Sequence, residues 1–253
     1  MRLDGRVGIV TGSASGVGAA TARMLAGRGC RVVVNYTRSE ADAEATRSAC
    51  AAAGADAMLC KADVAEDADC RRMVAAAVDR WGRLDVVVNS AGTSKLVPHA
   101  DLDGLSADDF RRIYAVNTIG PFQMMRAAAP HLRATGDAAV VNVSSGAGIG
   151  ARGSSIAYAA SKAALNNLTL QLARVLAPEV RVNTVCPALI EGRWMKSLLG
   201  DRYETHLAQA RARNPLQRVA TADDVARTIL WLITDAGTLT GECLSMDAGQ
   251  HLI

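Results

Sequence analysis

The chain has 253 residues, of which half are hydrophobic and 21% are charged, so it carries enough apolar material for a large core. Its formal net charge of +3 is small and spread along the sequence, which argues against a nucleic-acid-binding surface. The first residues lack the apolar segment of a signal peptide, and no apolar run approaches the ~18 residues that span a bilayer, so no membrane partner is expected.

Apolar strands alternate with helical segments from one end of the chain to the other. Each strand is too continuously apolar for a half-exposed sheet, which indicates burial on both faces and therefore a parallel arrangement. The alternation predicts an α/β fold, a single doubly wound domain over 1–253 with helices on both faces of a seven-stranded parallel sheet. The expected strands are 7–10, 31–35, 57–61, 84–88, 139–143, 181–185 and 243–246.

Helices are expected between these strands. Those at 39–54 and 66–81 are each followed or closed by a glycine, which favours a helix end. A longer helix is predicted over 106–133, and Pro121 is expected to kink it because proline lacks a backbone N–H. A last helix begins at Thr221, whose hydroxyl can cap it.

A glycine-rich turn, Gly12-Ser13-Ala14-Ser15-Gly16-Val17-Gly18, joins the first strand to the first helix. Glycines let a backbone approach a pyrophosphate closely, and a helix N-terminus presents unpaired N–H groups to it. A tight strand-to-helix turn without a ligand has the same composition, so the pattern gains meaning only from the rest of the chain.

Tyr158 and Lys162 stand one helical turn apart in an alanine-rich segment, so their side chains share one helix face. A nearby ammonium favours the phenolate, and Lys162 is therefore expected to lower the pKa of Tyr158 toward working pH. Ser145 follows the strand at 139–143, where its hydroxyl could hold a carbonyl oxygen beside the phenol. Taken alone, such a Tyr-x-x-x-Lys pair is more often a surface pair than a catalytic one.

Taken together, the motifs resemble the short-chain dehydrogenase/reductase family in order and spacing. They are Thr11-Gly12-x-x-x-Gly16-x-Gly18, Asn89-x-Ala91-Gly92, Asn117, Ser145, Tyr158-x-x-x-Lys162 and Pro187, and the likeness extends to the ending 239–249. The resemblance implies a Rossmann-type fold and an NAD(P)-dependent oxidoreductase acting on a carbonyl or an alcohol.

The resemblance also implies roles for four catalytic residues. Ser145 would orient the carbonyl oxygen, and Tyr158 would donate the proton. Lys162 would stabilise the phenolate and contact the nicotinamide ribose. Asn117 would hold a water in a proton relay, or alternatively would only bend the helix near Pro121.

The cofactor contacts implied by the resemblance lie at the carboxyl ends of the strands, with Asp63 alternatively a cap of the turn that follows it. Three positions depart from the family's pattern, Ser90 for Asn, Ala188 for Gly and Gly192 for Thr, so one hydroxyl contact is expected to be missing. The implied contacts are Gly12, Ser13, Ser15, Gly16, Val17, Gly18, Tyr36, Arg38, Ser39, Asp63, Val64, Asn89, Ala91, Gly92, Tyr158, Lys162, Pro187, Leu189 and Ile190.

The end of the second strand usually distinguishes NAD from NADP, because an acidic residue there accepts from the ribose 2′-OH and repels a 2′-phosphate. Tyr36 occupies that position, and Thr37-Arg38-Ser39 supplies hydroxyls, a guanidinium and a helix start, which suit a phosphate. We therefore expect NADP in preference to NAD. The alternative is a solvated Arg38, and Ser15 replaces the basic residue that many NADP-using relatives carry in the glycine loop.

Residues 189–216 resemble the family's variable substrate lid, in which Trp194 and Tyr203 either line an apolar pocket or pack within the lid. Arg152, Arg193 and His99 are candidates for a polar substrate contact, with solvated surface positions as the alternative. The sequence therefore leaves the identity of the substrate open.

Two alternatives to a small ketone, aldehyde or secondary alcohol remain. A 3-oxoacyl substrate on acyl carrier protein ranks lower, because 134–137 and 176–179 lack the arginines that such reductases tend to carry. A non-catalytic dinucleotide-sensing protein ranks lower still, because all four catalytic side chains are present.

Assembly, redox state and location are expectations of the same kind. Relatives are commonly tetramers, and Ala164, Leu165, Leu168 and Leu172 at helical spacing permit packing as a homotetramer or homodimer. The six cysteines show no Cys-x-x-Cys spacing, so neither a metal site nor a disulfide framework is expected. Reduced thiols are typical of a cytoplasmic protein.

Overall fold

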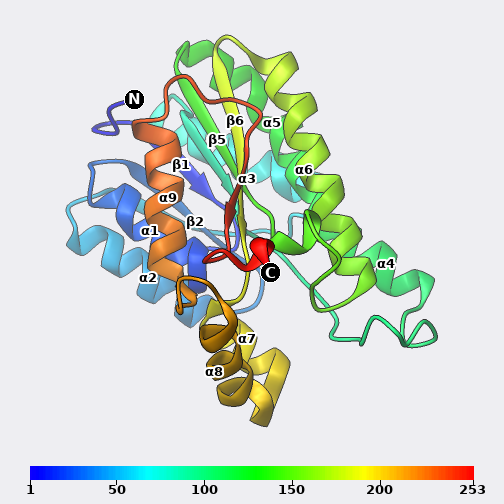
Figure 1. The fold of residues 1–253 in the computed structure, drawn as a ribbon. Coiled ribbons are helices and arrows are strands. Elements are labelled where there is room, and N and C mark those ends of the chain that lie inside the picture. The colour runs from blue at the N-terminus through cyan, green and yellow to red at the C-terminus, as the bar shows by residue number, and fades with distance from the viewer.

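A computed structural model describes residues 1–253 and has a seven-stranded parallel sheet at its centre (Figure 1). The strand order is β3-β2-β1-β4-β5-β6-β9, which confirms the predicted parallel seven-stranded sheet. The strands are β1 Val7–Val10, β2 Arg31–Tyr36, β3 Ala57–Lys61, β4 Val86–Asn89, β5 Ala138–Val143, β6 Val180–Pro187 and β9 Cys243–Met246.

Helices cover both faces of this sheet, each over its own hydrophobic core. On one face lie α1 (Gly16–Ala26), α2 (Glu40–Ala52) and α9 (Ala222–Thr234), and on the other lie α3 (Asp67–Trp81), α5 (Gly120–Thr135) and α6 (Ile156–Leu176). Because helices cover both faces, β1, β2, β4, β5 and β6 are buried in near-continuous runs, whereas the edge strands β3 and β9 are only partly buried, unlike the sequence expectation for every strand. None of the helices combines the length and apolarity needed to cross a bilayer.

The strand order reverses at β1, which pairs with β2 on one side and with β4 on the other. In a parallel sheet all carboxyl ends meet at one edge, and such a reversal opens a crevice there between loops that leave in opposite directions. The residues that follow β1, β4, β5 and β6 therefore share one edge of the sheet, and this edge carries every motif described above.

The helix predicted over 106–133 is not continuous. The structure has α4 (Ala107–Tyr114), a π-helical turn (Ala115–Ile119) and then α5. Pro121 has no N–H to give to the carbonyl four residues earlier, at Asn117, so the chain uses wider bonds such as that from Gly120 N–H to the Ala115 carbonyl. The expected kink thus takes the form of a π-turn that turns Asn117 into the interior, where it is 0% exposed.

Two of the α6 residues proposed from the sequence for subunit packing are instead buried inside the chain. Leu165 and Leu172 are buried, and Leu172 belongs to the core beneath α3 and α5. The expectation that they are free to contact another chain was wrong, because this helix lies flat on the sheet. Leu170 and Val175, on the opposite side of α6, are exposed.

A segment between β6 and α9 projects from the edge that carries the motifs (Figure 1). It contains α7 (Arg193–Leu199) and α8 (Tyr203–Arg213), and two short strands, β7 (Ile190–Glu191) and β8 (Ala220–Thr221), pair in parallel at its base. Tyr203, Leu207 and Val219 form its own small apolar core. The two short strands were not predicted, because each is only a dipeptide.

Asp85 fixes the opposite edge of the sheet, just before β4. Its carboxylate is fully buried and accepts hydrogen bonds from the Arg6 guanidinium at 2.6 Å, the Arg83 guanidinium at 2.7 Å and the Val7 N–H at 2.9 Å. Burial raises the pKa of this carboxyl, but the bonds from Arg83 and Arg6 outweigh burial and hold the pKa below its usual value. Asp85 therefore contributes stability that is lost as pH falls through its depressed pKa.

We expect Asp85→Asn to lower the free energy of unfolding by about 3 kcal/mol near neutral pH, because the guanidinium groups lose their buried counter-charge. The difference from the parent protein should shrink in acid, as pH falls through the depressed pKa of the native carboxyl. Urea unfolding near neutral pH and across this acidic range measures the change. Asp108→Asn is the control, since Asp108 pairs with Arg111 but its side chain is 88% exposed; equal losses in the two variants would contradict the prediction.

Candidate active site

The turn between β1 and α1 is held by Asn35, a residue near the end of β2. Its Oδ1 accepts the Gly12 N–H at 2.9 Å, while its Nδ2 donates to the carbonyls of Cys60 and Ala62. Its backbone N–H donates to Ser13 Oγ at 2.8 Å. One buried amide thus fixes the glycine turn against two neighbouring strands. Sequence reasoning missed it, although an amide inside an apolar strand was a visible signal.

The glycines of this turn serve two different purposes. A Cβ at Gly12 would lie 2.8 Å from Ala91 Cα, and one at Gly18 would lie 2.5 Å from the Gly12 carbonyl oxygen, so both are required by close packing of the chain itself. Gly16 has φ +57° and open space around its missing side chain. Ser15 begins α1 without a side-chain cap, so the first N–H groups remain available and fit a pyrophosphate.

At the ends of β3 and β4, several of the groups expected to contact the cofactor make hydrogen bonds within the protein. Asp63 Oδ1 accepts the Ala65 N–H at 3.0 Å, which is the turn-capping alternative, and the Val64 carbonyl accepts from Gln123. After β4, the N–H groups of Ser90 and Ala91 both donate to Thr11 Oγ1. This bond ties the β4 loop to the glycine turn.

At the ends of β4, β5 and β6 runs a buried chain of polar side chains that was not predicted. Asn89 Nδ2 donates to Asn142 Oδ1 at 2.8 Å, Asn142 Nδ2 donates to Thr169 Oγ1 at 2.8 Å, and Thr169 shares a 2.6 Å bond with Thr184. Only Asn89 Oδ1 in this chain of contacts is buried without a partner. The chain joins three strands and α6 directly beneath the candidate catalytic residues.

Tyr158, Lys162 and Ser145 come together at the carboxyl end of β5, each less than 10% exposed. Ser155 Oγ caps α6 by accepting the Tyr158 N–H, so the helix start places Tyr158 and Lys162 on its inner face. Lys162 Nζ donates to the Val143 carbonyl at 2.8 Å and lies 5.8 Å from the centre of the Tyr158 ring. The three side chains that the sequence singled out therefore share one site.

Ser145 is held loosely. Its Oγ accepts the Ala147 N–H at 3.1 Å and donates to the Pro187 carbonyl over a long 3.4 Å. Gly148, in the short 3₁₀ turn that follows, would place a Cβ 2.6 Å from the Lys162 carbonyl carbon. That turn can therefore lie against α6 only because residue 148 is glycine, which brings Ser145 close to the helix.

The protonation states differ from the sequence expectation. Burial raises the pKa of Tyr158 to about 12, with Ser145 acting in the opposite direction. Burial also lowers the pKa of Lys162 to about 8. The sequence predicted a lower pKa for Tyr158, but in the structure burial moves this pKa in the opposite direction, and Lys162 is not among the groups that shift it.

Asn117 is a fully engaged structural amide. Its Oδ1 accepts the Thr93 N–H at 2.8 Å, and its Nδ2 donates to the Thr93 carbonyl at 2.9 Å and to Ser161 Oγ at 3.0 Å. Ser161 in turn donates to the Tyr158 carbonyl at 2.7 Å. The side chain thus joins the β4 loop to α6, while the backbone carbonyl of Asn117 lacks its α-helical donor because of Pro121.

Residues 36–39, at the end of β2, occupy the position that distinguishes NAD from NADP. Tyr36 is buried at the end of β2, and burial together with the nearby Glu40 carboxylate raises the pKa of its phenol. Arg38 and Ser39 are exposed, and Arg38 forms no ion pair. Ser39 precedes α2 without a side-chain hydrogen bond to it, so the start of α2 lacks the cap that the sequence predicted.

The α7–α8 segment covers the site from one side. The Trp194 ring lies 6.2 Å from the Tyr158 ring and is 47% exposed, whereas Tyr203 is buried and accepts the Gly192 N–H. Arg193 contacts Asp42 on α2 at 3.1 Å, so it is directed away from the site. Of the remaining predicted contacts, Val17 and Ile190 pack against the core beside α1, and Leu189 packs against Tyr203.

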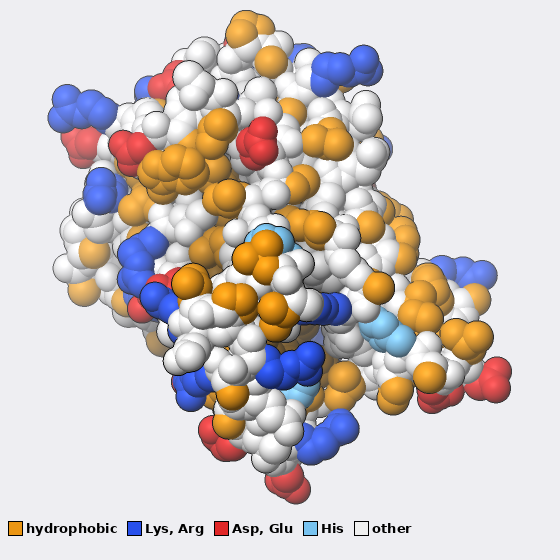
Figure 2. Space-filling model, in the orientation of Figure 1, with side chains coloured by type: hydrophobic (Ala, Val, Ile, Leu, Met, Phe, Trp, Pro, Cys, Tyr) orange, Lys and Arg blue, Asp and Glu red, His pale blue; other side chains and the backbone are white.

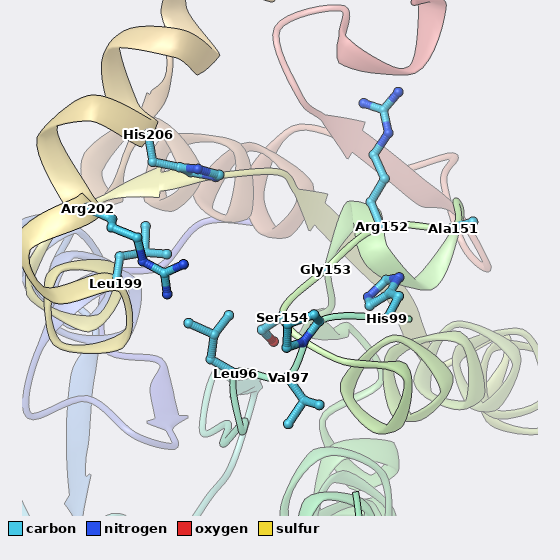
Figure 3. Close-up of a pocket in the computed structure, with 11 residues that line it drawn as sticks. Leu96, Val97, His99, Ala151, Arg152, Gly153, Ser154, Leu199, Arg202 and His206 are labelled. Carbon is cyan, nitrogen blue, oxygen red and sulfur yellow. The ribbon is translucent and has the colours of Figure 1, made fainter. Parts of the chain in front are cut away.

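A cavity of about 490 Å³ lies between the α7–α8 segment and the loops at 96–99 and 151–154 (Figure 3), and the Tyr158 ring lies behind this last loop rather than in the lining. Its wall includes Gly153, at which an added Cβ would lie 3.5 Å from the Tyr158 ring. On the face shown in Figure 2, arginine, lysine and histidine side chains gather over the α7–α8 segment and around the adjoining hollow. The volume is typical of sites for small ligands.

Comparison with known proteins gives matches along almost the whole chain. The family model described as enoyl-(acyl carrier protein) reductase matches residues 12–251. A protein of Streptomyces violaceoruber named as a ketoacyl reductase of granaticin polyketide synthase is 45% identical, over 98% of this chain and 96% of its own. A crystal structure from Burkholderia xenovorans, described as a short-chain dehydrogenase/reductase, superposes with TM-score 0.91 at 40% identity, covering 98% of both chains. Levodione reductase superposes with TM-score 0.92 at 28% identity, covering 99% of both.

Asn117→Ala should lower the free energy of unfolding by about 2 kcal/mol, because it leaves the backbone groups of Thr93 without partners inside the protein. Chemical unfolding followed by circular dichroism measures the loss. Asn167→Ala is the matched control, since Asn167 is exposed on α6 and makes no side-chain hydrogen bond. A change of less than about 0.5 kcal/mol in both variants would show that the amide does not hold the loop.

Proposed function

The chain belongs to the short-chain dehydrogenase/reductase family, and from that premise we propose that it performs NADPH-linked reduction of a ketone or aldehyde, or the reverse oxidation of a secondary alcohol. Membership makes it an oxidoreductase that uses a nicotinamide dinucleotide, which removes the non-catalytic sensor from consideration. The observation that carries the proposal is the buried grouping of Ser145, Tyr158 and Lys162 at the rim of the sheet.

The residues present fit the cofactor. The open space at Gly16 and the uncapped start of α1 would accept its pyrophosphate. Arg38 and Ser39 would face the adenosine ribose, and Lys162 with Pro187 would face the nicotinamide ribose and ring. When bound, the dinucleotide supplies or accepts the hydride, so the protein has only to orient the carbonyl and move a proton.

Each polar group has a task in that proton transfer. Ser145 Oγ exchanges its long bond to the Pro187 carbonyl for a bond to the substrate oxygen. Tyr158, with a pKa of about 12, stays protonated near neutral pH and is ready to donate. Lys162, with a pKa of about 8, is still mostly charged there and stabilises the phenolate that donation leaves.

Return of the proton needs a path to Lys162. We assign this role to the backbone carbonyl of Asn117, since the side-chain amide is committed to Thr93 and Ser161. The carbonyl has a free lone pair because Pro121 cannot donate to it, so it can anchor a water between Lys162 and solvent. In this arrangement the π-turn is part of the catalytic apparatus.

NADP is the cofactor we propose. Arg38 has no carboxylate partner and stands just before the start of α2, where a 2′-phosphate would meet a guanidinium and a helix N-terminus. The Glu40 carboxylate next to Tyr36 opposes this choice. The guanidinium can form two parallel hydrogen bonds to a phosphate, which outweighs a single carboxylate in solvent.

A second candidate is a ketoacyl reductase that acts on substrates attached to an acyl carrier protein. The relative named as a ketoacyl reductase, at 45% identity, favours it. The end of α6 and the turn after it, 176–179, contain no arginine to bind an acidic carrier, which weighs against it. Comparing rates on a carrier-bound ketoacyl thioester and on small ketones separates the two.

Assembly into a homotetramer or homodimer in the cytoplasm completes the proposal. Apolar side chains exposed on α4, α5 and α6 support it, in place of the buried leucines considered first; they are Phe110, Phe122, Leu170 and Val175. All six cysteines are free thiols, as a reducing compartment would keep them.

Tyr158→Phe should reduce kcat/KM for a good carbonyl substrate by about 10³-fold, since it removes the general acid and keeps the ring. Oxidation of NADPH followed by absorbance measures the loss, and circular dichroism checks the fold. Tyr114→Phe, on α4, is the matched control and should retain activity. Near-normal turnover by the Tyr158 variant would refute the role of the phenol.

Arg38→Ala should lower kcat/KM with NADPH about tenfold while leaving the value with NADH nearly unchanged, because only NADPH carries the phosphate. Arg28→Ala removes an exposed arginine just after the C-terminal end of α1 and serves as the control for the change in net charge. If the parent enzyme works better with NADH, or if Arg38→Ala weakens both cofactors equally, the NADP assignment fails.

A further inference from the structure

The cavity beside Tyr158 has a strongly one-sided charge. Arg152, Arg202, His99 and His206 contribute to its lining, and no aspartate or glutamate does. A smaller adjoining hollow shares Arg152 and His206 and adds Arg213, again without an acidic residue. The two spaces together form a site with three guanidinium groups and two imidazoles, although the chain as a whole has a net charge of only +3.

Two of these guanidinium groups have no partner in the protein. Arg202 and Arg213 form neither an ion pair nor a hydrogen bond, unlike their neighbour Arg211, which pairs with Glu191 at 2.7 Å. The guanidinium of Arg152 is occupied, since it donates to the backbone oxygens of Gln250 and Ile253. In Figure 3 the side chains of Arg202 and His206 project from the α7–α8 side into the cavity, whereas Arg152 points out of it.

The opposite wall of the cavity carries an unpaired polar group. The Nε2 atom of His99 is buried and has no hydrogen-bond partner. The loop that carries it is tied to the loop at 151–154, because the Val97 N–H donates to the Ser154 carbonyl at 2.8 Å and Ser94 is hydrogen-bonded to Ser154. A buried polar nitrogen left unpaired in a well-held loop is costly unless a ligand or a water satisfies it.

We propose that the substrate carries a carboxylate group, which Arg202 and His206 bind in this cavity while its carbonyl lies at Tyr158. The inference rests on the proposed function, because it concerns the far end of the same site. Arginine is always charged and forms paired bonds to a carboxylate, and histidine can donate in either neutral form. The acidic side chains nearest in the sequence, Asp201 and Glu204, are exposed and do not line the cavity.

The placement explains why the charge lies on the α7–α8 segment. Trp194 of that segment lies 6.2 Å from the Tyr158 ring, and Leu199 and Arg202 of the same segment line the cavity. A substrate that reaches from the cavity past Gly153 to the phenol would therefore keep its other end near Arg202. An ion pair in a partly enclosed cavity is less screened by salt than one in open solvent. The carboxylate would thereby orient the carbonyl toward Ser145 and Tyr158.

A matched pair of ketones tests the inference, namely 4-acetylbenzoate and its neutral isostere 4-acetylbenzamide. We expect the holoenzyme to show a kcat/KM about tenfold higher for the acid, which corresponds to about 1.4 kcal/mol. Arg202→Gln should remove most of this preference, chiefly by lowering kcat/KM for the acid. Arg174→Gln is the control, because Arg174 is an exposed arginine without an ion pair at the far end of α6. Added salt should slow only the acid.

Equal rates for acid and amide would overturn the inference while leaving the proposed reduction intact. A preference for the acid that survives Arg202→Gln would overturn the assignment to this cavity. Preference for a carrier-bound ketoacyl thioester, with no gain from the free carboxylate, would also overturn it and favour the second candidate. If neither ketone is reduced, binding of the two ketones to the complex with oxidised cofactor is measured by calorimetry instead. Tighter binding of the acid that is lost in Arg202→Gln supports the inference. Equal binding of acid and amide overturns it.

Discussion

The site depends on an ammonium group that has been taken out of water. Lys162 is 4% exposed, and the hydrogen bond of its Nζ goes to the backbone carbonyl of Val143, where β5 ends. A carbonyl dipole compensates only part of the hydration that an ammonium loses on burial, so the proton is held weakly and the pKa falls to about 8. The phenol of Tyr158 is buried beside it, and burial raises its pKa to about 12. Near neutral pH both groups therefore carry their protons, and the pKa of Lys162 lies close enough to that pH for its proton to be released.

The surrounding polar scaffold keeps that pair in place. The π-turn brings Asn117 into the interior, where its amide ties the loop after β4 to α6 through Thr93 and Ser161. Beneath it, the chain from Asn89 through Asn142 and Thr169 joins three strands to the same helix. Because each of these groups is buried, breaking one bond leaves unpaired partners, and the arrangement is correspondingly rigid. The covering segment, α7–α8, has its own small core, so its charge and shape can vary without disturbing the proton-transfer groups.

The regular part of the fold could be predicted from the sequence because it depends on local patterns. Continuous apolar runs located all seven strands, the helix predicted to start at 106 begins there with Ser106 as its cap, and Thr221 caps the last helix as predicted. The spacing of Tyr158 and Lys162 and the position of Ser145 led to three side chains that the structure brings together. Contacts between distant residues could not be predicted in the same way. Nothing local to Asn35 shows that it fixes the glycine turn, and nothing local to Leu165 shows which side of α6 faces the sheet.

The pKa directions failed for a related reason, since spacing alone gives the distance between two groups and not their exposure to water. The central claim is therefore the burial of Lys162, and a titration of the lysine side chains tests it most directly. The chain contains Lys61, Lys95, Lys162 and Lys196, so NMR of protein labelled with ¹³C at lysine Cε yields few signals, and Lys162→Arg identifies the relevant one. The account predicts that this signal titrates at a pKa of about 8. Titration of Lys162 near ~10.4, the ordinary value for a lysine, would contradict it.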